Sequence, residues 1–311
     1  MATERKELET ITPPANAAVH VDMSNDRYHA MGNWSHSQLK HLPHGPELFE
    51  WNYILKREKR SVTRGMECGS ALHAWLLEGI EPTTVPADFL TKAGSVKPGG
   101  WAAIAAEFPG VPVLKADEAA GLLYARDNCY ADPEIRAYLE TAGQVEHSLF
   151  SVDPETSLPT RIRLDKLCQF TDGMVCLDLK YSADITDRWV DKQVSNMAYY
   201  SQAGMYWEHV ERAYETPRAW AFLFVKNGPP YTARLFKMLD HDVELGTRHT
   251  HVSLRDLRAR LDTDDWRGEG FGGVGTIEVK SWVWDVNPEP LEAHQEFTEF
   301  SQTINQSEGE L

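Results

Sequence analysis

The sequence contains few cysteines and no long apolar run. Its four cysteines, Cys68, Cys129, Cys168 and Cys176, lie far apart and form no Cys-x-x-Cys pair, the spacing that zinc and iron–sulfur sites usually include. We therefore interpret them as small buried or half-buried residues and expect no iron–sulfur cluster and no disulfide. No apolar run approaches the ~20 residues of a membrane-spanning helix, so we expect no membrane partner.

Two further motifs are missing. The glycine-rich stretch "GEGFGGVG" (residues 268–275) is not followed by Lys-Ser or Lys-Thr, as a phosphate-binding loop would be, so ATP use is not indicated. The first ten residues, "MATERKELET", are charged and lack the apolar stretch of a secretory signal. We therefore expect a cytoplasmic location.

Basic residues are the scarcer kind of charge. The 311 residues include 31 Lys and Arg against 47 Asp and Glu, for a net charge of −16, which argues at first against a polyanionic partner. The distribution weakens that argument. Residues 285–311 contain seven acids and no Lys or Arg, whereas "KREKRSVTR" (Lys56–Arg64) contains five basic residues and one acid. Because local clusters decide where phosphates bind, a nucleic-acid partner stays open.

The order of the predicted elements indicates an α+β (α/β) fold. We divide the chain into a loose leader (1–25), a single domain (26–285) and an acidic tail (286–311). Helices predominate in the domain up to residue 141 and form an N-terminal helical extension. A core of strands and helices is expected over residues 142–285.

The core begins with three short strands. The runs 145–151, 159–166 and 174–180 are alternating or apolar. Turn-forming "DPETSLP" and "TDG" separate them, which predicts an antiparallel meander. A long helix is expected at about 187–213, followed by strands in "RAWAFLFV" and "YTARLFKM" and by a helix at about 242–261.

Three helices are expected in the N-terminal part. "SHSQLKHL" predicts a helix capped by Ser35 or Ser37, and "HGPELFEWNYILKREKR" predicts a second after Pro46. The basic residues of this second helix would lie at its C-terminal end, where the helix dipole favours cations. "RGMECGSALHAWLLEGI" predicts a third helix, which ends at Gly79.

Two expected strands carry two aspartates and a lysine. Because side chains alternate across a strand, Arg161, Arg163 and Asp165 of "RIRLD" share one face. By the same rule Asp178 and Lys180 of "CLDLK" share a face. If the two strands pair as a hairpin, the two polar faces converge on one side of the sheet.

These groups match the needs of a divalent cation. Two carboxylates with backbone carbonyls, such as that of Leu179 between Asp178 and Lys180, form an oxygen cage suited to Mg²⁺ or Mn²⁺. Such a cation activates a bound water and polarises a phosphoryl oxygen. A lysine beside it can orient the water or hold the phosphate. The alternative is a solvated sheet face with weak Lys–Asp pairs.

Two helices offer further polar residues. His73 lies four residues after Gly69 on the third helix, and Gln202 and Tyr206 are four residues apart in "NMAYYSQAGMYWEHV". Gln202 and Tyr206 share a helix face and can hydrogen-bond a phosphate. Each also has a purely structural explanation, since a histidine at the edge of an apolar stripe and an aromatic stripe are commonly part of a core.

The order of these motifs is more specific than any one of them. A helix with Gly-x-x-x-His is followed by a strand with Asp, a strand with Asp-x-Lys and a helix with Gln-x-x-x-Tyr. In "MECGSALHAWLLE", "RIRLDKL", "LDLK" and "QAGMY" the sequence resembles the PD-(D/E)XK nuclease superfamily, in its exonuclease VIII-like, RecB-like branch. The resemblance covers about Trp34 to Val210. It implies a mixed central sheet flanked by helices.

The resemblance implies an activity and its partners. It indicates a divalent-metal-dependent exodeoxyribonuclease of phage-type recombination, which degrades linear duplex DNA from 5′ ends and leaves 3′ single strands for an annealing protein. Relatives form rings, so a homo-oligomer is expected. Two alternatives stay open: a catalytically silent nuclease-fold module that binds DNA ends or a partner, and a single-strand-specific RecB-like nuclease.

The resemblance also implies roles for individual residues. The expected metal site consists of His73, Asp165, Asp178, the Leu179 carbonyl and, where the branch often has an acidic residue, Glu146. Lys180 would be catalytic, and Gln202 with Tyr206 would support the substrate end. The candidate DNA and phosphate ligands are Arg161, Arg163, Arg64 and, at a helix N-terminus, Ser35 and Ser37.

Overall fold

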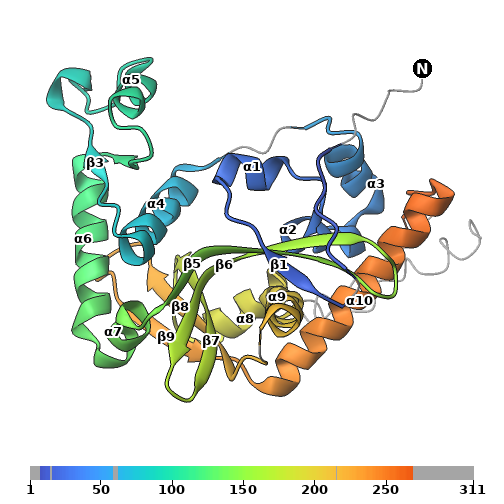
Figure 1. Ribbon diagram of the computed structural model, residues 1–311. Helices are drawn as coiled ribbons and strands as arrows, with labels where there is room; N and C mark the ends of the chain where they lie inside the picture. The colour runs from blue at the N-terminus through green and yellow to red at the C-terminus, as the bar shows by residue number, and fades with distance from the viewer. Residues whose placement is uncertain (1–7, 15, 59–61, 215, 269–311) are drawn as a thin grey trace, which may run out of the picture. The chain divides into compact units, whose positions relative to one another are not determined.

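A mixed sheet of seven strands organises the part of the chain that the structure describes. In the computed structural model these residues are 8–14, 16–58, 62–214 and 216–268. The strand order is β1-β5-β6-β7-β8-β9, with β2 paired to β6 outside this path (Figure 1). The predicted core boundary at residue 285 and the acidic tail lie outside the described residues.

The expected meander forms the centre of the sheet. It consists of β5 (Gly143–Val152), β6 (Pro159–Phe170) and β7 (Gly173–Ser182), each antiparallel to the next. β8 (Ala219–Lys226) pairs parallel to β7, so the chain must cross over between them through helices. β9 (Ala233–Lys237) returns antiparallel to β8. The α+β fold class and the mixed sheet are therefore confirmed.

Two short strands of this sheet were not expected. β1 (Ala18–His20) pairs antiparallel with β5, so the predicted loose leader contains an edge strand of the sheet. β2 (Trp34–Ser35) pairs parallel with β6. Strands of two or three residues are too short to show an alternating pattern, which is why the sequence did not indicate them.

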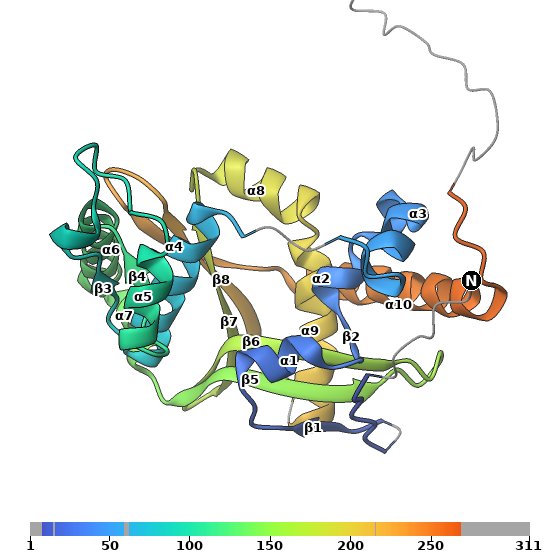
Figure 2. The same ribbon diagram turned by 90° about the horizontal axis from the view of Figure 1, so that it is seen from above.

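Helices cover both faces of the sheet (Figures 1 and 2). On one face lie α9 (Tyr199–Ala213) and α10 (Asp240–Thr263), and on the other α4 (Arg64–His73), α6 (Ala116–Ala131) and α7 (Pro133–Glu140). β8 supplies Trp220, Phe222 and Phe224 to one core and Ala221, Leu223 and Val225 to the other. It is apolar almost throughout because both of its faces are covered.

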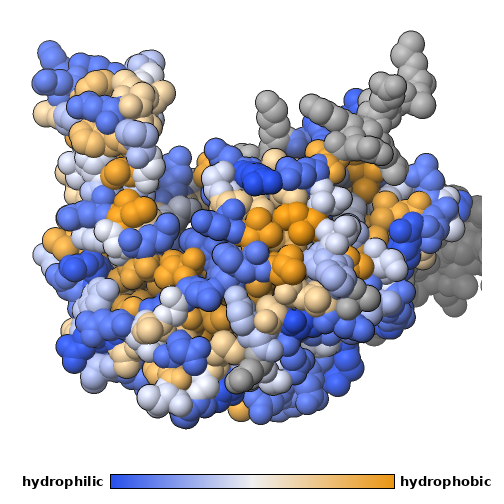
Figure 3. Space-filling view, viewed as in Figure 1, coloured by the Kyte–Doolittle hydropathy of each residue, from blue (hydrophilic) through white to orange (hydrophobic). Residues whose placement is uncertain are grey.

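The remaining helices are short. They are α1 (Asn25–Ala30), α2 (His36–Leu39), α3 (Pro46–Phe49), α5 (Gly100–Glu107) and α8 (Asp187–Asn196), with 3₁₀ turns at Leu42–His44 and Ala87–Phe89. α5 lies with β3 (Thr83–Thr84) and β4 (Val113–Leu114) beyond one end of α6 and stands clear of the sheet (Figures 1 and 3). No helix among the described residues has the length and apolar composition to cross a membrane.

Two helix predictions need correction. The helix expected over residues 187–213 is two helices, because Ala198 adopts a left-handed backbone with φ of 54° between α8 and α9. The helix after Pro46 continues as a π-helical segment only to Ile54, and Lys56 has a φ of 52°. Lys56 and Arg57 therefore follow the helix instead of forming its last turn. The third helix ends at Gly79 as predicted, after a π-helical segment over Ala74–Glu78.

Candidate active site

β6 and β7 separate at the two aspartates. The paired residues of the two strands extend as far as Lys166 and Leu177, so Asp165 and Asp178 are the next residues on each strand. Asp165 Oδ2 accepts a hydrogen bond of 2.7 Å from the Leu179 backbone nitrogen. A side-chain carboxylate thus takes the place of a backbone acceptor where the strands diverge, and this bond holds Asp165 against β7.

α4 brings His73 to the same point. Its Nε2 lies 3.0 Å from the Leu179 carbonyl oxygen and 3.5 Å from Asp165 Oδ2. One turn earlier, a Cβ at Gly69 would lie 3.4 Å from the Cβ of Tyr181 on β7. The small residue in the Gly-x-x-x-His motif therefore sits where α4 packs on β7, next to the predicted ligand.

β5 contributes Glu146 on the other side of Asp165. Its neighbours Val145 and His147 pair with β6, but Glu146 does not, and its φ of 49° lies in the left-handed region. This backbone conformation costs a non-glycine residue about 1–3 kcal/mol and is concentrated at functional sites. One potential ligand atom each from His73, Glu146 and Asp165 lies within 4.8 Å of the others.

Asp178, Lys180 and Gln202 form the second half of the site. Lys180 Nζ lies 2.6 Å from Asp178 Oδ2 and donates a hydrogen bond of 3.2 Å to Gln202 Oε1. Gln202 Nε2 in turn donates to Asp178 Oδ1 at 2.7 Å. The Asp178 side chain is only 4% exposed, so its charge is neutralised mainly by Lys180.

The structure brings the predicted residues together but divides them into two groups. Asp165 faces His73 and the Leu179 backbone, while Asp178 faces Lys180 and Gln202. The cluster of potential ligands includes Glu146 and lacks Asp178. Coordination of a cation by Asp178 stays a prediction, since it would require the carboxylate to share its bonds with Lys180.

Burial and repulsion raise the pKa values of the carboxyl groups. Burial raises the pKa of Glu146 to about 7, and the charge of Asp165 contributes. Burial likewise raises the pKa of Asp165 to about 6, with a contribution from Asp178 that His73 opposes. Burial opposes the charge of Lys180, but Asp178, Tyr199 and Asp165 together outweigh it, so the lysine pKa is raised. The His73 side of the site therefore has an excess of negative charge.

The donor set fits a hard divalent cation. An imidazole, two carboxylates and the Leu179 carbonyl offer oxygen and nitrogen ligands of the kind that Mn²⁺ and Mg²⁺ accept. The four cysteines are buried elsewhere, in α4, α6, β6 and β7, as the sequence predicted. A cation would also relieve the repulsion that raises the pKa values of Glu146 and Asp165.

Tyr206 stands behind the site. Its ring packs edge-to-face on Trp220 with the centroids 5.8 Å apart, as part of the core. Burial, with the nearby charges of Asp178 and Asp165, raises its pKa well above the usual value. Of the predicted Gln-x-x-x-Tyr pair, Gln202 contacts the charged residues directly, and Tyr206 supports them from the core side.

The two arginines of β6 fasten α1 to the sheet. Both guanidinium groups lie over the Tyr28 ring, and Arg161 donates to the Met31 carbonyl. Arg163 donates to Ser148 Oγ, the Met23 carbonyl and Asn25 Oδ1, and lies 3.9 Å from Glu146. Arg163 is thus beside the ligand cluster, whereas Arg161 is buried away from solvent.

The other predicted phosphate ligands have local partners. Ser35 caps α2, and its hydroxyl lies 2.9 Å from that of Ser37. Arg64 lies at the end of α4 opposite His73 and pairs with Glu118 and Glu67. A phosphate contact by Arg64 would have to displace these carboxylates, so the structure places Arg64 outside the site.

Two residues near the site were not expected. The Tyr199 ring lies 4.4 Å from Lys180 Nζ, in cation–π geometry. His36, between the predicted Ser35 and Ser37, is buried, and its Nε2 has no hydrogen-bond partner among the described residues. The break at Ala198 positions Tyr199, because it starts α9 at this residue. No periodic pattern in the sequence indicates such a break.

Comparison with known proteins agrees with this geometry. The family model of a "PDDEXK-like domain of unknown function (DUF3799)" matches residues 35–267. No curated protein matches the chain. A crystal structure from Eubacterium rectale, described as a "Putative exonuclease", superposes with a TM-score of 0.54 at 12% identity, covering 87% of this chain and all of that one. The predicted superfamily is confirmed: the chain belongs to the PDDEXK-like family that this model describes.

Proposed function

We propose that the protein is a divalent-metal-dependent exodeoxyribonuclease that degrades linear duplex DNA from 5′ ends. The observation that carries the proposal is the convergence of His73, Glu146 and Asp165 beside the Asp178–Lys180–Gln202 triangle. Structural ion pairs match opposite charges, whereas this cluster gathers half-buried carboxylates whose pKa values are raised. Such an arrangement is typical of a functional site.

Each residue has a chemical task in this proposal. His73, Glu146, Asp165 and the Leu179 carbonyl would hold Mg²⁺ or Mn²⁺, with Asp178 as a further ligand. The cation, when bound, would lower the pKa of a coordinated water and polarise the scissile phosphate. Lys180 would hold a phosphate oxygen or the attacking water, and Gln202 would keep its ammonium group in place.

The direction of cleavage and the partners extend the proposal. Duplex ends, 5′ polarity and supply of 3′ strands to an annealing protein rest on the resemblance of the four ordered motifs to exonuclease VIII-like enzymes. The fold likeness to a protein described as an exonuclease supports the same class. A ring of several copies would suit a processive enzyme, and a cytoplasmic location would suit its substrate.

End-labelled DNA tests the proposal directly. Linear duplex labelled at either the 5′ or the 3′ end is incubated with Mg²⁺, Mn²⁺ or EDTA, and a closed circle is the control. Early release of the 5′ label, with the circle intact, is expected only with a metal. Binding of ends without any product under either ion would favour the silent module, and preferential loss of single strands would favour the single-strand nuclease.

A further inference from the structure

Lys180 has an aromatic neighbour besides its two polar partners. Its Nζ lies 4.4 Å from the centroid of the Tyr199 ring and 6.0 Å from that of Phe222. The face of an aromatic ring has a partial negative charge, which attracts an ammonium group within about 6 Å. Only 18% of the Lys180 side chain is exposed, so little water screens this contact. The ring is therefore a third partner of the ammonium group, after Asp178 and Gln202.

β8 supports the Tyr199 ring. The ring centroid lies 5.9 Å from that of Phe222 and 6.4 Å from that of Phe224. In the parallel pairing of β7 and β8, Phe222 is the partner of Asp178. Phe224 is likewise the partner of Lys180, and both phenylalanines are buried in the core. The strand beside the site thus supplies the surface against which Tyr199 packs.

The start of α9 fixes the position of Tyr199 relative to Gln202. Tyr199 is the first residue of the helix, after the left-handed residue Ala198, and Gln202 follows three residues later. Side chains at this spacing are neighbours on one helix face. Both reach Lys180, Gln202 through a hydrogen bond of 3.2 Å and Tyr199 through its ring. The first turn of α9 therefore supplies two uncharged partners of the ammonium group.

An uncharged partner matters most when a cation is bound. In the structure Lys180 pairs with Asp178 at 2.6 Å. If Asp178 also binds the cation, its charge is shared and the cation repels the ammonium group. The ring face attracts an ammonium group but has none of the oxygen lone pairs that hard divalent cations require. The Tyr199 ring can therefore hold Lys180 without competing for the metal.

We propose that Tyr199 is a positioning residue whose ring keeps the Lys180 ammonium group in place when the cation is bound. This role rests on the proposed metal-dependent nuclease activity, in which Lys180 holds a phosphate oxygen or the attacking water. Tyr199 is not one of the residues that define the four ordered motifs. Its ring, and not its hydroxyl group, is the functional part, and it affects the rate of cleavage without binding the cation or the DNA.

Two substitutions separate the ring from its hydroxyl group. Tyr199→Phe keeps the ring, whereas Tyr199→Leu keeps an apolar side chain and removes the ring. We expect Tyr199→Leu to lower kcat about 3- to 30-fold, the range that corresponds to a partly buried cation–π contact, while KM for DNA changes little. Tyr199→Phe should retain most of the wild-type kcat. Full activity of Tyr199→Leu, or equal loss in the two variants, would overturn the proposal.

Tyr200 provides a matched control on the same turn of α9. It is also half-buried, but it contacts α10, where its hydroxyl lies 2.9 Å from His249 Nδ1. Tyr200→Leu should therefore lower the melting temperature and leave kcat nearly unchanged. A loss of kcat in Tyr200→Leu as large as that in Tyr199→Leu would attribute the effect to the start of the helix and overturn the proposal.

NMR of protein with isotope-labelled lysine Cε gives a readout without catalysis. Protons over an aromatic ring resonate upfield, and Lys180→Gln identifies the signal of Lys180 by removing it. We expect this signal upfield of the other lysines in the wild type and in Tyr199→Phe, with and without saturating Mg²⁺, but not in Tyr199→Leu.

Two results of this NMR experiment would overturn the proposal. One is an ordinary position of the Lys180 signal in the wild type, and the other is loss of the upfield shift when Mg²⁺ is added. A wild-type protein inactive with every metal would instead refute the nuclease proposal, and the spectrum would still decide whether Tyr199 holds Lys180.

Discussion

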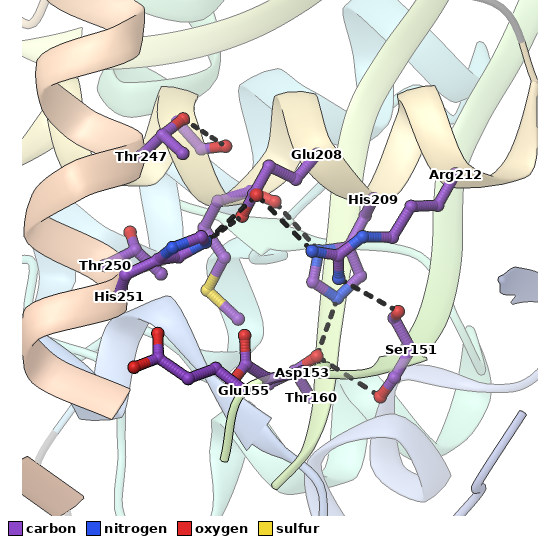
Figure 4. A network of polar contacts seen from close by, with 12 residues as sticks. Ser151, Asp153, Glu155, Thr160, Glu208, His209, Arg212, Thr247, Thr250 and His251 are labelled. Carbon is purple, nitrogen blue, oxygen red and sulfur yellow. Dashed lines mark hydrogen bonds and ion pairs between the residues drawn. The ribbon is translucent and has the colours of Figure 1, made fainter. Parts of the chain in front are cut away.

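Residues of α9 take part in two polar clusters, and the charges in these clusters are arranged in opposite ways. Gln202 enters the candidate active site, where the potential metal ligands His73, Glu146 and Asp165 gather. Two turns further along, Glu208, His209 and Arg212 enter a network with α10 and the paired strands β5 and β6 (Figure 4). We call the first group the site cluster; it comprises Gln202, Asp178, Lys180 and the three potential ligands. We call the second group the α9–α10 network.

The α9–α10 network matches each charge with a partner. Glu208 accepts from His251 at 3.0 Å and from Arg212 at 3.3 Å, and Arg212 also donates to Ser151 Oγ. The Thr160 hydroxyl lies between His209 Nε2 and the Ser151 carbonyl. Glu208 raises the pKa of His251 and so favours the charged form of this histidine.

The site cluster instead places like charges together. Burial and the charge of Asp165 raise the pKa of Glu146, and burial and the charge of Asp178 raise that of Asp165. Glu146 also adopts a strained backbone. A folded chain keeps such an arrangement at a cost in stability, which a bound cation would offset. Residues of one helix thus take part both in a cluster of mismatched charge, as expected of a functional site, and in a network of matched charge.

Replacing one carboxylate by its amide in each cluster should give the largest difference between the clusters, because one change should lower kcat and the other should lower stability. Asp178→Asn removes the charge that pairs with Lys180 and should lower kcat about 10²–10³-fold, the usual effect of losing one electrostatic contact at a reaction centre. Glu208→Gln should leave kcat within about threefold and lower stability instead. Nuclease rates and melting curves of both variants check this, and an active Asp178→Asn protein would refute the proposed site.

Metal should stabilise the site cluster and not the network. At a hundredfold excess over its dissociation constant a ligand adds about 2.7 kcal/mol to the free energy of unfolding. For a chain of this size that corresponds to a rise in melting temperature of several degrees. We expect this rise with Mg²⁺ or Mn²⁺ in the wild type and in Glu208→Gln, and its loss in Asp165→Asn. A rise that persists in Asp165→Asn would place the cation elsewhere.

Neutralising Glu146 should stabilise the metal-free protein. Its pKa of about 7 lies above the usual value, so above pH 7 the folded chain holds an unfavourable charge. Glu146→Gln should therefore raise the free energy of unfolding at pH 8 by roughly 1 kcal/mol, a value reduced for its partial exposure. The gain should fade as pH falls toward the unfolded pKa of about 4.3. Urea titrations at pH 8 and pH 5 without metal measure it, and an equal gain at both would exclude charge relief.

Removing the His251–Glu208 pair should change the free energy of unfolding least, and this change should depend on pH in the opposite direction to that of Glu146→Gln. Because the folded pKa of His251 is raised, its stabilisation is complete below the unfolded value of about 6.5 and is lost as pH rises through the folded pKa. His251→Gln should therefore cost up to about 1 kcal/mol at pH 5.5 and less at pH 9. Chemical denaturation of His251→Gln at pH 5.5 and pH 9 would measure this loss. Arg255→Gln, which removes the neighbouring exposed ion pair of Arg255 with Glu155, is the control. A loss that grows with pH would contradict the assignment.

Much of the fold follows from local patterns. The three strands of the meander, β8, β9 and the helix α10 lie where alternation and period predicted them, because each buries a face against the core. The strands β1 and β2 and the break at Ala198 were not predicted. A strand of two or three residues and a single left-handed residue depend on contacts from distant segments, and local sequence does not encode them.

The features of the candidate site likewise divide into those that the sequence predicted and those that it did not. By itself the sequence determined which residue types would meet: Asp165, Asp178, Lys180 and His73 occur in an order and spacing that place them on adjoining strands and one helix. Only the tertiary structure decided how they pair. The strained backbone at Glu146, the split between β6 and β7 and the start of α9 at Tyr199 set the two halves of the site. Pairing depends on ångström-scale distances between elements, whereas a sequence pattern specifies only the face on which a side chain lies.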